Sequence, residues 1–296
     1  MKTNLKKLLP GVRENISLKN YNTFKIGGKT RYFFAAKNKD KLVSAILVAK
    51  KLKLPFFILG NGSNLLVSDK GFKGLVVKIK SGMWKVEGSK TYAEAGVFLT
   101  QLLTLALKNN LTGLEWAIGI PGTLGGAIYG NAGAFGKSMS NIVKEVEVYD
   151  TNNRKIKILK NKDCKFGYRQ SIFKNNKNLI IISAKLRLKK GNKEKIKQKM
   201  RAYSNHRVRT QPLKFPSIGS IFKNPKGLFA AELIEKCGLK GKRTGNVQVS
   251  EKHSNFIINL GKGKARDVLK LINLIKKRVK EKFEVNLEEE IIYLGF

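Results

Sequence analysis

The sequence predicts an α+β fold of two or three domains. Residues 31–59 read as strand, helix and strand, residues 142–188 are rich in alternating and β-branched runs, and the last third again mixes helices with strands. With 296 residues, of which 42% are hydrophobic, the chain can build a sizeable core and is not a disordered protein. Near Lys190 the chain becomes basic and helical, and a Pro-bounded connector follows at 207–216, so we place a domain boundary there.

The individual helices and strands are predicted from the spacing of hydrophobic residues and from the Gly and Pro residues that end them. Leu42, Ile46 and Ala49 recur at helical spacing, and Pro55 ends that helix. Aromatic and β-branched residues mark the strands. The sequence predicts a helical lead-in over 1–20, helices over 40–53, 98–108, 192–205, 228–237 and 265–282, and strands over 31–36, 56–59, 74–79, within 83–96, and over 142–149, 155–159, 179–188, 255–260 and 291–294.

The chain is strongly basic, with 60 Lys and Arg against 20 Asp and Glu and a formal net charge of +40. Such a charge attracts anionic ligands and is also typical of nucleic-acid-binding proteins. Two features suggest that the excess of lysine reflects an AT-rich genome rather than a binding function. Lys is more frequent than Arg, with Asn and Ile also abundant, and the lysines are spread over the whole length of the chain. We therefore expect a solvated basic surface, with nucleic-acid binding as the alternative.

The few cysteines and histidines argue against several kinds of site. Cys164 and Cys237 lie far apart and outside any CxxC pattern, which argues against a disulfide or a metal site. His206 and His253 are too isolated for a metal centre or a Ser-His-Asp triad. No apolar run is long enough to cross a bilayer, and the basic N-terminus lacks the apolar core of a signal peptide. We expect a cytoplasmic protein with no membrane insertion and no metal.

One uncharged stretch, residues 119–136, interrupts the lysine-rich chain and is dominated by Gly and Ala. Glycine permits positive φ and lets a ligand approach backbone N–H groups without a Cβ in the way. Successive exposed N–H groups can hold a phosphate or pyrophosphate. A tight glycine turn between two core elements is the alternative.

Two shorter segments also carry residue types that suit anions. Gly60-Asn61-Gly62-Ser63-Asn64 follows the strand at 56–59, and ligands bind at strand ends in folds of this kind. Arg169 lies among aromatic and small residues, where an arginine holds a carboxylate or phosphate more often than it faces water. A plain turn and a structural ion pair are the respective alternatives.

Six segments that are separated in the sequence together resemble one protein family. They are Asn22-Thr23 with Gly27-Gly28, Gly60-Asn61-Gly62-Ser63-Asn64, residues 119–136, Gly167-Tyr168-Arg169, Gly219-Ser220 with Phe222-Lys223-Asn224-Pro225, and Leu287-Glu288-Glu289-Glu290. Together, from about Asn20 to the end of the chain, they resemble the MurB family of UDP-N-acetylenolpyruvoylglucosamine reductases, and the lack of a long insertion in the third domain resembles its type II members. The acidic motif lacks the proline that often precedes its last glutamate, so Glu288 and Glu289 stay open as alternatives to Glu290.

The resemblance implies a two-subdomain FAD-binding fold of the vanillyl-alcohol-oxidase (PCMH) type, followed by a C-terminal α+β substrate-binding domain. It implies a lead-in over 1–25, an FAD-binding domain over 26–190 with subdomains of about 26–81 and 82–190, and a substrate-binding domain over 191–296. The FAD-binding residues that it implies are Asn22, Thr23, Gly60, Asn61, Gly62, Ser63, Asn64, Gly119, Ile120, Pro121, Gly122, Gly125, Gly126, Asn131 and Gly133.

The resemblance also implies a reaction in peptidoglycan synthesis. NADPH reduces FAD, which passes a hydride to the terminal CH2 of an enolpyruvyl UDP-sugar, giving UDP-N-acetylmuramate. Arg169 is the candidate partner of the substrate carboxylate as enolate charge develops, and Glu290, in its protonated form, shares that carboxyl group. Ser220 is the candidate proton donor to C2. Tyr168, Lys223 and Asn224 are the implied substrate-binding residues.

Two other functions stay open at this stage. Another FAD-dependent oxidase or dehydrogenase of the same fold would share the FAD loops without needing Ser220 and Glu290. A nucleic-acid-binding protein is suggested by the +40 charge alone, and the sequence has no recognisable motif for binding RNA or DNA. The expected partners are the UDP-sugar enolpyruvyl ether and NADPH, and we expect a monomer.

Overall fold

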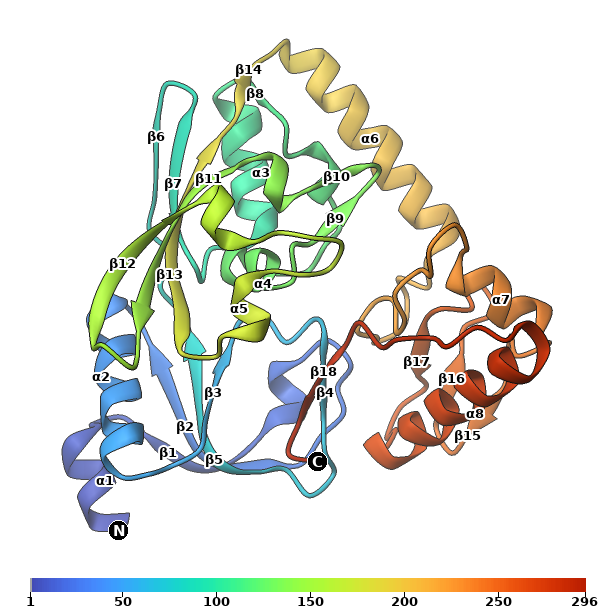
Figure 1. The fold of residues 1–296 in the computed structure, drawn as a ribbon, viewed down its shortest axis with the longest axis horizontal. Helices are drawn as coiled ribbons and strands as arrows, with labels where there is room; N and C mark the ends of the chain where they lie inside the picture. Colours follow the sequence, from blue (N-terminus) through green and yellow to red (C-terminus); the bar gives the residue numbers. More distant parts are fainter. Residues whose placement is uncertain (1) are drawn as a thin grey trace. The chain divides into compact units, whose positions relative to one another are not determined.

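The computed structural model describes residues 2–296, with side chains from Leu5 onward, and the chain forms two compact units (Figure 1). Unit 1 comprises the N-terminal residues to Arg13, then Phe33–Asn61 and Gly74–His206. Unit 2 comprises Glu14–Tyr32, Gly62–Lys73 and Arg207–Phe296. Each unit is therefore assembled from segments that are distant in the sequence.

Unit 1 contains most of the helices, a five-stranded sheet, and β3 and most of β5 from a four-stranded sheet. Its helices are α1 (Lys2–Leu8), α2 (Lys39–Lys51), α3 (Leu99–Lys108), α4 (Leu124–Tyr129), α5 (Ile172–Asn175) and the long α6 (Lys193–Thr210), with 3-10 turns η2 (Glu115–Ala117), η3 (Met139–Asn141) and η4 (Asn161–Cys164). Its strands are β3 (Phe56–Leu59), β5 (Phe72–Ile79), β6 (Trp84–Glu87), β7 (Lys90–Glu94), β8 (Leu111–Thr112), β9 (Gly133–Ala134), β10 (Lys137–Ser138), β11 (Val143–Asp150), β12 (Lys155–Lys160), β13 (Leu179–Arg187) and β14 (Lys189–Lys190).

Two sheets organise these strands. A five-stranded antiparallel sheet has the order β12-β11-β13-β7-β6, and α4 packs against β7 and β13 (Figure 1). A four-stranded sheet has the order β1-β2-β5-β3, where β1 is Arg13–Ser17 and β2 is Lys29–Ala36. In it β3 pairs in parallel with β5, from Phe56 opposite Leu75 to Leu59 opposite Lys78, so the loop after β3 begins beside Lys78.

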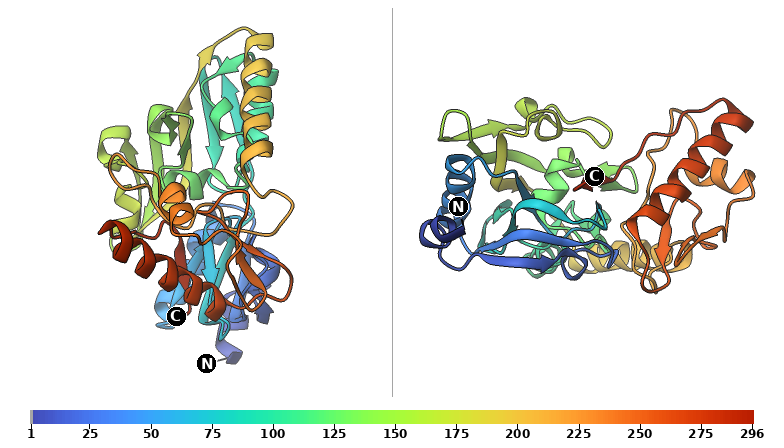
Figure 2. Two further views of the ribbon diagram at one scale, coloured as in Figure 1. Left: turned by 90° about the vertical axis from the view of Figure 1, so that its right-hand side faces the viewer. Right: turned by 90° about the horizontal axis from the view of Figure 1, so that it is seen from below.

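Unit 2 is built around α8 (Ala265–Phe283), which lies along a three-stranded antiparallel sheet (Figure 2). That sheet has the order β15-β16-β17. The bounds of its remaining elements are η1 (Leu18–Tyr21), β4 (Leu65–Val67), α7 (Ala230–Lys236), β15 (Arg243–Thr244), β16 (Val247–Val249), β17 (Ile257–Asn259) and β18 (Ile292–Leu294). The last strand, β18, pairs in parallel with β4, which joins the C-terminus to residues 65–67.

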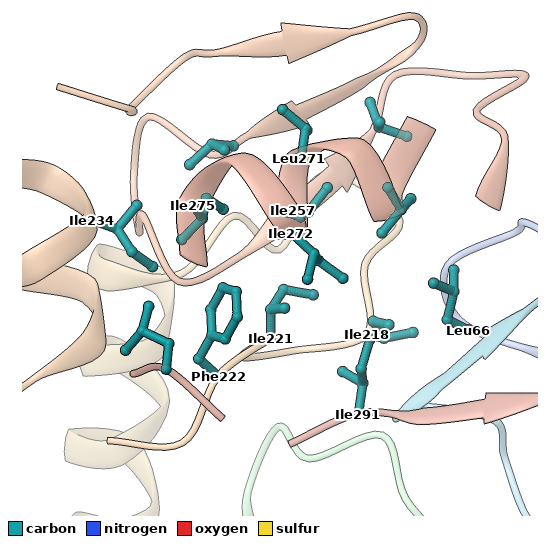
Figure 3. Packing of buried hydrophobic residues seen from close by; sticks show 14 of the residues in the cluster. Leu66, Ile218, Ile221, Phe222, Ile234, Ile257, Leu271, Ile272, Ile275 and Ile291 are labelled. Atoms are coloured by element: carbon teal, nitrogen blue, oxygen red, sulfur yellow. The ribbon is translucent and has the colours of Figure 1, made fainter. Parts of the chain in front are cut away.

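The core of unit 2 is a cluster of buried aliphatic and aromatic side chains (Figure 3). Leu271, Ile272 and Ile275 of α8 recur at helical spacing and are at most 1% exposed. Phe222 and Leu66, from segments far away in the sequence, belong to the same cluster. The residues at helical spacing thus form the face of α8 that is buried in this core.

A carboxylate from a distant segment also caps α8. The backbone N–H groups of Ala265 and Arg266 donate to the Asp69 carboxylate at 2.9 and 3.0 Å. A negative charge at this end satisfies two N–H groups that lack partners within the helix and interacts favourably with its dipole. The cap is one of the contacts that join residues 62–73 to unit 2.

The structure confirms most of the predicted elements, and its two compact units have other bounds than the predicted domains. The expected lead-in over 1–25 is divided, because its second half contains β1 and η1 and belongs to unit 2. The expected boundary at 190/191 falls inside unit 1, which continues to His206 along α6. Helix α6 also runs into the predicted connector and ends at Thr210, shortly before Pro212, which lacks the N–H that a continuing helix needs.

Among the residues that the structure describes, no helix is both long enough and apolar enough to cross a membrane.

Candidate active site

In unit 1 the loop after β3 lies against the start of the glycine-rich stretch. The Asn61 side chain donates through Nδ2 to the backbone oxygen of Pro121 at 2.6 Å. A Cβ on Gly60 would lie 2.6 Å from Oγ1 of Thr123, closer than side-chain atoms pack. Gly60 is therefore required for this approach, and two predicted FAD loops are brought together within one unit.

The middle of the glycine-rich stretch forms a helix that the sequence analysis did not predict. The N–H groups of Leu124 and Gly125 donate to the backbone oxygens of Val97 and Ala95 at 2.8 and 2.9 Å, and the N–H of Gly126 points to Thr123 Oγ1 at 3.5 Å. These three N–H groups are therefore used inside the protein. This part of the stretch is therefore a short helix rather than a tight glycine turn, and contact of Gly125 and Gly126 with FAD stays a prediction.

Other N–H groups of the two loops are available to a ligand. Across the described chain, no protein group accepts a hydrogen bond from the backbone N–H of Asn61, Gly122 or Thr123. Gly119 has a φ of +75°, which suits glycine, and leads through Ile120 into this turn. Unused donors beside a glycine that permits close approach are what a pyrophosphate requires, so these residues fit FAD.

Tyr168 and Arg169 form the tip of a tight turn that the glycine-rich stretch holds. Gly167 and Gln170 exchange backbone hydrogen bonds of 3.0 and 3.1 Å around the turn. Asn131 Nδ2 donates to the Gly167 oxygen at 2.8 Å, and its Oδ1 accepts from a backbone N–H of η3 at 2.9 Å. Asn131 thus has a structural role, and its contact with FAD stays a prediction.

Arg169 adopts an unusual backbone conformation for an arginine. Its φ is +54°, in the left-handed region. Its Nη2 donates to the Gly133 oxygen at 3.0 Å, and its guanidinium lies 5.2 Å from the centre of the exposed Tyr168 ring. Strained residues of this kind cluster at functional sites, and these contacts fix the direction of the guanidinium fork.

In unit 2 the predicted catalytic segment pairs with the acidic motif. The N–H of Glu290 donates to the Ile221 oxygen at 2.8 Å, and the N–H of Lys223 donates to the Glu288 oxygen at 2.9 Å. The segment that carries Ser220 is thus hydrogen-bonded to the segment that carries Glu290. The sequence separation of these two segments gave no indication of this pairing.

The three glutamates of the motif have different surroundings. Glu288 forms an ion pair with Lys223 at 2.8 Å, which lowers the pKa of its carboxyl group, and Glu289 forms one with Lys276 at 2.9 Å. The backbone of Glu290 is held on both sides, because its oxygen also accepts from Asn64 Nδ2 at 2.9 Å. The structure therefore assigns lysine partners to the first two glutamates.

The remaining predicted residues of unit 2 also have structural contacts. Asn22 Nδ2 donates within its own loop, to the oxygens of Leu18 and Ile26. Thr23 Oγ1 donates to the oxygen of residue 217 at 2.6 Å, and the Thr23 N–H donates to the Gly62 oxygen at 3.3 Å. The Oδ1 of Asn224 accepts from the first N–H of α7 at 3.1 Å. Ser63 is half-buried in the loop before β4.

Two residues that the sequence analysis missed contact the predicted FAD loops. Thr123 caps α4 and lies against Gly60. Lys78 Nζ donates to the Gly60 oxygen from near the end of β5, between the buried residues Val77 and Ile79. A lysine directly after the apolar run Leu75-Val76-Val77 was the available signal for Lys78, but the many other lysines in the chain concealed it.

Comparison with known proteins gives consistent matches over almost the whole chain. Residues 30–158 match the FAD binding domain model, and residues 211–294 match the model of the UDP-N-acetylenolpyruvoylglucosamine reductase C-terminal domain. The UDP-N-acetylenolpyruvoylglucosamine reductase of Caldanaerobacter subterraneus subsp. tengcongensis is 50% identical over 282 residues, which cover 95% of this chain and 93% of that protein. The reductase of Clostridium novyi is 44% identical over 285 residues, 96% of this chain and 92% of that protein.

A solved structure agrees with these sequence matches. The crystal structure of the MurB reductase from Thermus caldophilus superposes with a TM-score of 0.83 at 34% identity, covering 96% of this chain and all of that one. The match confirms the predicted FAD-binding fold with its C-terminal α+β domain, and the oxidase and nucleic-acid-binding alternatives gain no support. The chain belongs to the MurB family of UDP-N-acetylenolpyruvoylglucosamine reductases.

Proposed function

We propose that this protein reduces the enolpyruvyl ether of UDP-N-acetylglucosamine to UDP-N-acetylmuramate with NADPH, in peptidoglycan synthesis. The observation that carries the proposal is the 50% identity to a reductase of that name over 95% of the chain. Bound FAD supplies the hydride chemistry between NADPH and the vinyl carbon of the substrate. We propose that the reaction takes place in the cytoplasm and that a monomer carries it out.

Arg169 is the proposed partner of the substrate carboxylate. Negative charge moves onto this carboxylate as the enolate develops, and a preorganised cation stabilises that charge without having to rearrange. The left-handed backbone and the bond from Nη2 to the Gly133 oxygen support the role, because both restrict the guanidinium before substrate arrives. An arginine guanidinium presents N–H donors in the parallel geometry that a carboxylate accepts.

Glu290 is the proposed second group at the substrate carboxyl. A charged glutamate would repel the substrate carboxylate, so Glu290 acts in its protonated form and donates a hydrogen bond. The two backbone hydrogen bonds that hold Glu290 support this choice within the acidic motif.

Ser220 is the proposed proton donor to C2 of the substrate. A serine hydroxyl is a weak acid, but an enolate carbon is basic enough to accept its proton when the two are aligned. The pairing of this segment with the acidic motif supports the role, because it fixes the backbone on which Ser220 is carried. Tyr168, Lys223 and Asn224 are the proposed substrate-binding residues, and Lys223 is already paired with Glu288.

The proposed FAD-binding residues are those of the loops at 22–23, 60–64 and 119–133. The unused N–H groups of Asn61, Gly122 and Thr123 support a pyrophosphate position in unit 1.

Product analysis tests the proposed function. We expect the purified, FAD-loaded protein to oxidise NADPH only when the enolpyruvyl UDP-sugar is added, with a product heavier than the substrate by two hydrogens. Omission of the UDP-sugar and heat inactivation of the protein are the controls. Hydrogen peroxide formation from an alcohol or hydroxy acid, without reduction of the UDP-sugar, would replace the proposal with the oxidase alternative.

A further inference from the structure

Two peptide groups in unit 1 are each held by their carbonyl oxygen. Lys78 Nζ donates to the oxygen of Gly60, and Asn61 Nδ2 donates to the oxygen of Pro121 at 2.6 Å. The held oxygens belong to the peptide groups Gly60–Asn61 and Pro121–Gly122. Both peptides lie in loops that we propose to contact FAD.

Holding the oxygen of a trans peptide also fixes the direction of its N–H. The C=O and N–H bonds of a planar trans peptide point in opposite directions, and the described chain contains no cis peptide. The N–H of Asn61 therefore points away from Lys78, and the N–H of Gly122 points away from the Asn61 amide. Neither N–H has an acceptor in the described protein, so both are oriented donors without a partner.

The two loops are also close together. A Cβ on Gly60 would lie 2.6 Å from Thr123 Oγ1, so no side chain separates the two loops at this point. Two oriented donors on adjacent loops suit the oxygens of a phosphate or pyrophosphate. The N-terminal N–H groups of α4 do not contribute, because Leu124 and Gly125 donate to the protein backbone.

Lys78 differs from the surface lysines of the chain. Burial, together with nearby Lys80, lowers the pKa of its ammonium group to about 8. Along the described residues no carboxylate pairs with it, and its hydrogen-bond partner is the neutral Gly60 oxygen. A half-buried cation without a counter-charge is stabilised when an anion binds close by.

We infer that Lys78 is a positioning residue for FAD: it orients the Gly60–Asn61 peptide so that the Asn61 N–H faces the pyrophosphate, and it supplies positive charge behind that peptide. The inference rests on the proposed assignment of the two loops to FAD. It gives Lys78 a role in cofactor affinity, with no contact to the reacting atoms.

The test compares FAD binding by variants of the full chain. Lys78→Met keeps most of the aliphatic stem and removes the donor and the charge, whereas Lys78→Arg keeps both. Lys80→Met, at an exposed position just after the end of β5, makes the same change of charge and is the matched control. The dissociation constant of FAD is measured by titrating each apoprotein with FAD and following quenching of the flavin fluorescence, and the melting temperature of each apoprotein is recorded.

We expect Lys78→Met to raise the dissociation constant roughly 10- to 100-fold, the range for losing a charged hydrogen bond. Lys78→Arg should recover most of the affinity, and Lys80→Met should stay within about twofold of the wild type. A Lys78→Met apoprotein that binds FAD as tightly as Lys80→Met overturns the inference while the proposed function stands. Failure of Lys78→Arg to recover affinity also overturns it, since packing alone would then explain the loss. A wild-type chain that binds no FAD overturns the proposed function itself.

Discussion

Arg169 combines a left-handed backbone with a guanidinium whose Nη2 donates to the Gly133 oxygen. A glycine or asparagine would occupy the same backbone region at lower conformational cost. The contacts to Gly133 and to the Tyr168 ring instead hold an arginine there. At the scale of single residues, this is the strongest structural indication of a catalytic role.

Replacement of Arg169 by Ala should cost about 2–4 kcal/mol of transition-state stabilisation, because a preorganised donor to the developing charge is lost. The fall should be seen in kcat/KM for the UDP-sugar, with reduction of the flavin by NADPH retained. Arg154→Ala is a matched control, since Arg154 is exposed and has the same φ of +54° in the turn after β11. A loss confined to KM would argue against stabilisation of the transition state.

Replacement of Ser220 by Ala should slow flavin reoxidation by the UDP-sugar and leave flavin reduction by NADPH intact. The expected difference arises because the hydroxyl is needed only when C2 of the substrate is protonated. Anaerobic stopped-flow absorbance separates the two half-reactions, and Ser217→Ala, in the same segment, is the control. Equal losses in both half-reactions would exclude Ser220 as the proton donor.

His253 should make the fold sensitive to acid. Burial, more than the charge of Lys240, lowers the pKa of the folded imidazole below its ordinary value near 6.5. The unfolded chain therefore binds more protons than the folded chain below about pH 6.5, so stability falls as the pH falls through this range. Urea unfolding of the wild type should lose more free energy between pH 7 and pH 5 than unfolding of His253→Gln. Equal losses in the two proteins would contradict this assignment, and exposed His206→Gln is the control.

At the scale of elements, strands and helices with clear periodicity were predictable, and those made by tertiary contacts were not. Strand β5 and helix α8 follow from runs of apolar residues at the expected spacing. Helix α4 lies in a stretch of glycine and alanine, whose glycines disfavour helix, and it forms because Gly125 allows close packing on Ala95. Short β15 and β16 were also missed, since their two or three residues show no periodicity.

The two adjacent glycines of α4 should respond in opposite ways to alanine. A Cβ on Gly125 would lie 2.8 Å from the Ala95 Cβ, whereas a Cβ on Gly126 would meet only Thr123 Oγ1 at 3.6 Å. Gly125→Ala should therefore lose about 1–3 kcal/mol through overpacking, which outweighs its better helix propensity. Gly126→Ala should be neutral or gain up to about 1 kcal/mol. Chemical unfolding of the two apoproteins makes the comparison, and equal stabilities would show that α4 is loosely packed.

At the scale of the whole molecule, the motifs identified the family but not the division of the chain into units. The pairing of β18 with β4 and the Asp69 cap on α8 join segments about 200 residues apart, and no local pattern reports such contacts. The candidate site was predictable in its residue types, because glycine loops, an isolated arginine and an acidic motif stand out in the sequence. The hydrogen bonds by which Asn22, Asn131 and Asn224 hold backbone segments could not be predicted. The sequence does not distinguish an amide that holds a loop from an amide that binds a ligand.

The +40 charge is a property of the whole chain, and its sign suits anionic FAD, NADPH and UDP-sugar. Charge spread in this way raises the encounter rate with anions in general and selects none of them. Specificity must therefore come from local hydrogen-bond donors and shape rather than from the net charge.

The central claim is that this chain transfers a hydride from NADPH through FAD to the enolpyruvyl UDP-sugar. An anaerobic visible absorption trace of the FAD-loaded protein tests it, with NADPH added first and the UDP-sugar second. We predict that the yellow colour bleaches with NADPH and returns with the UDP-sugar. A flavin that bleaches with NADPH but stays bleached after the UDP-sugar is added would contradict the claim.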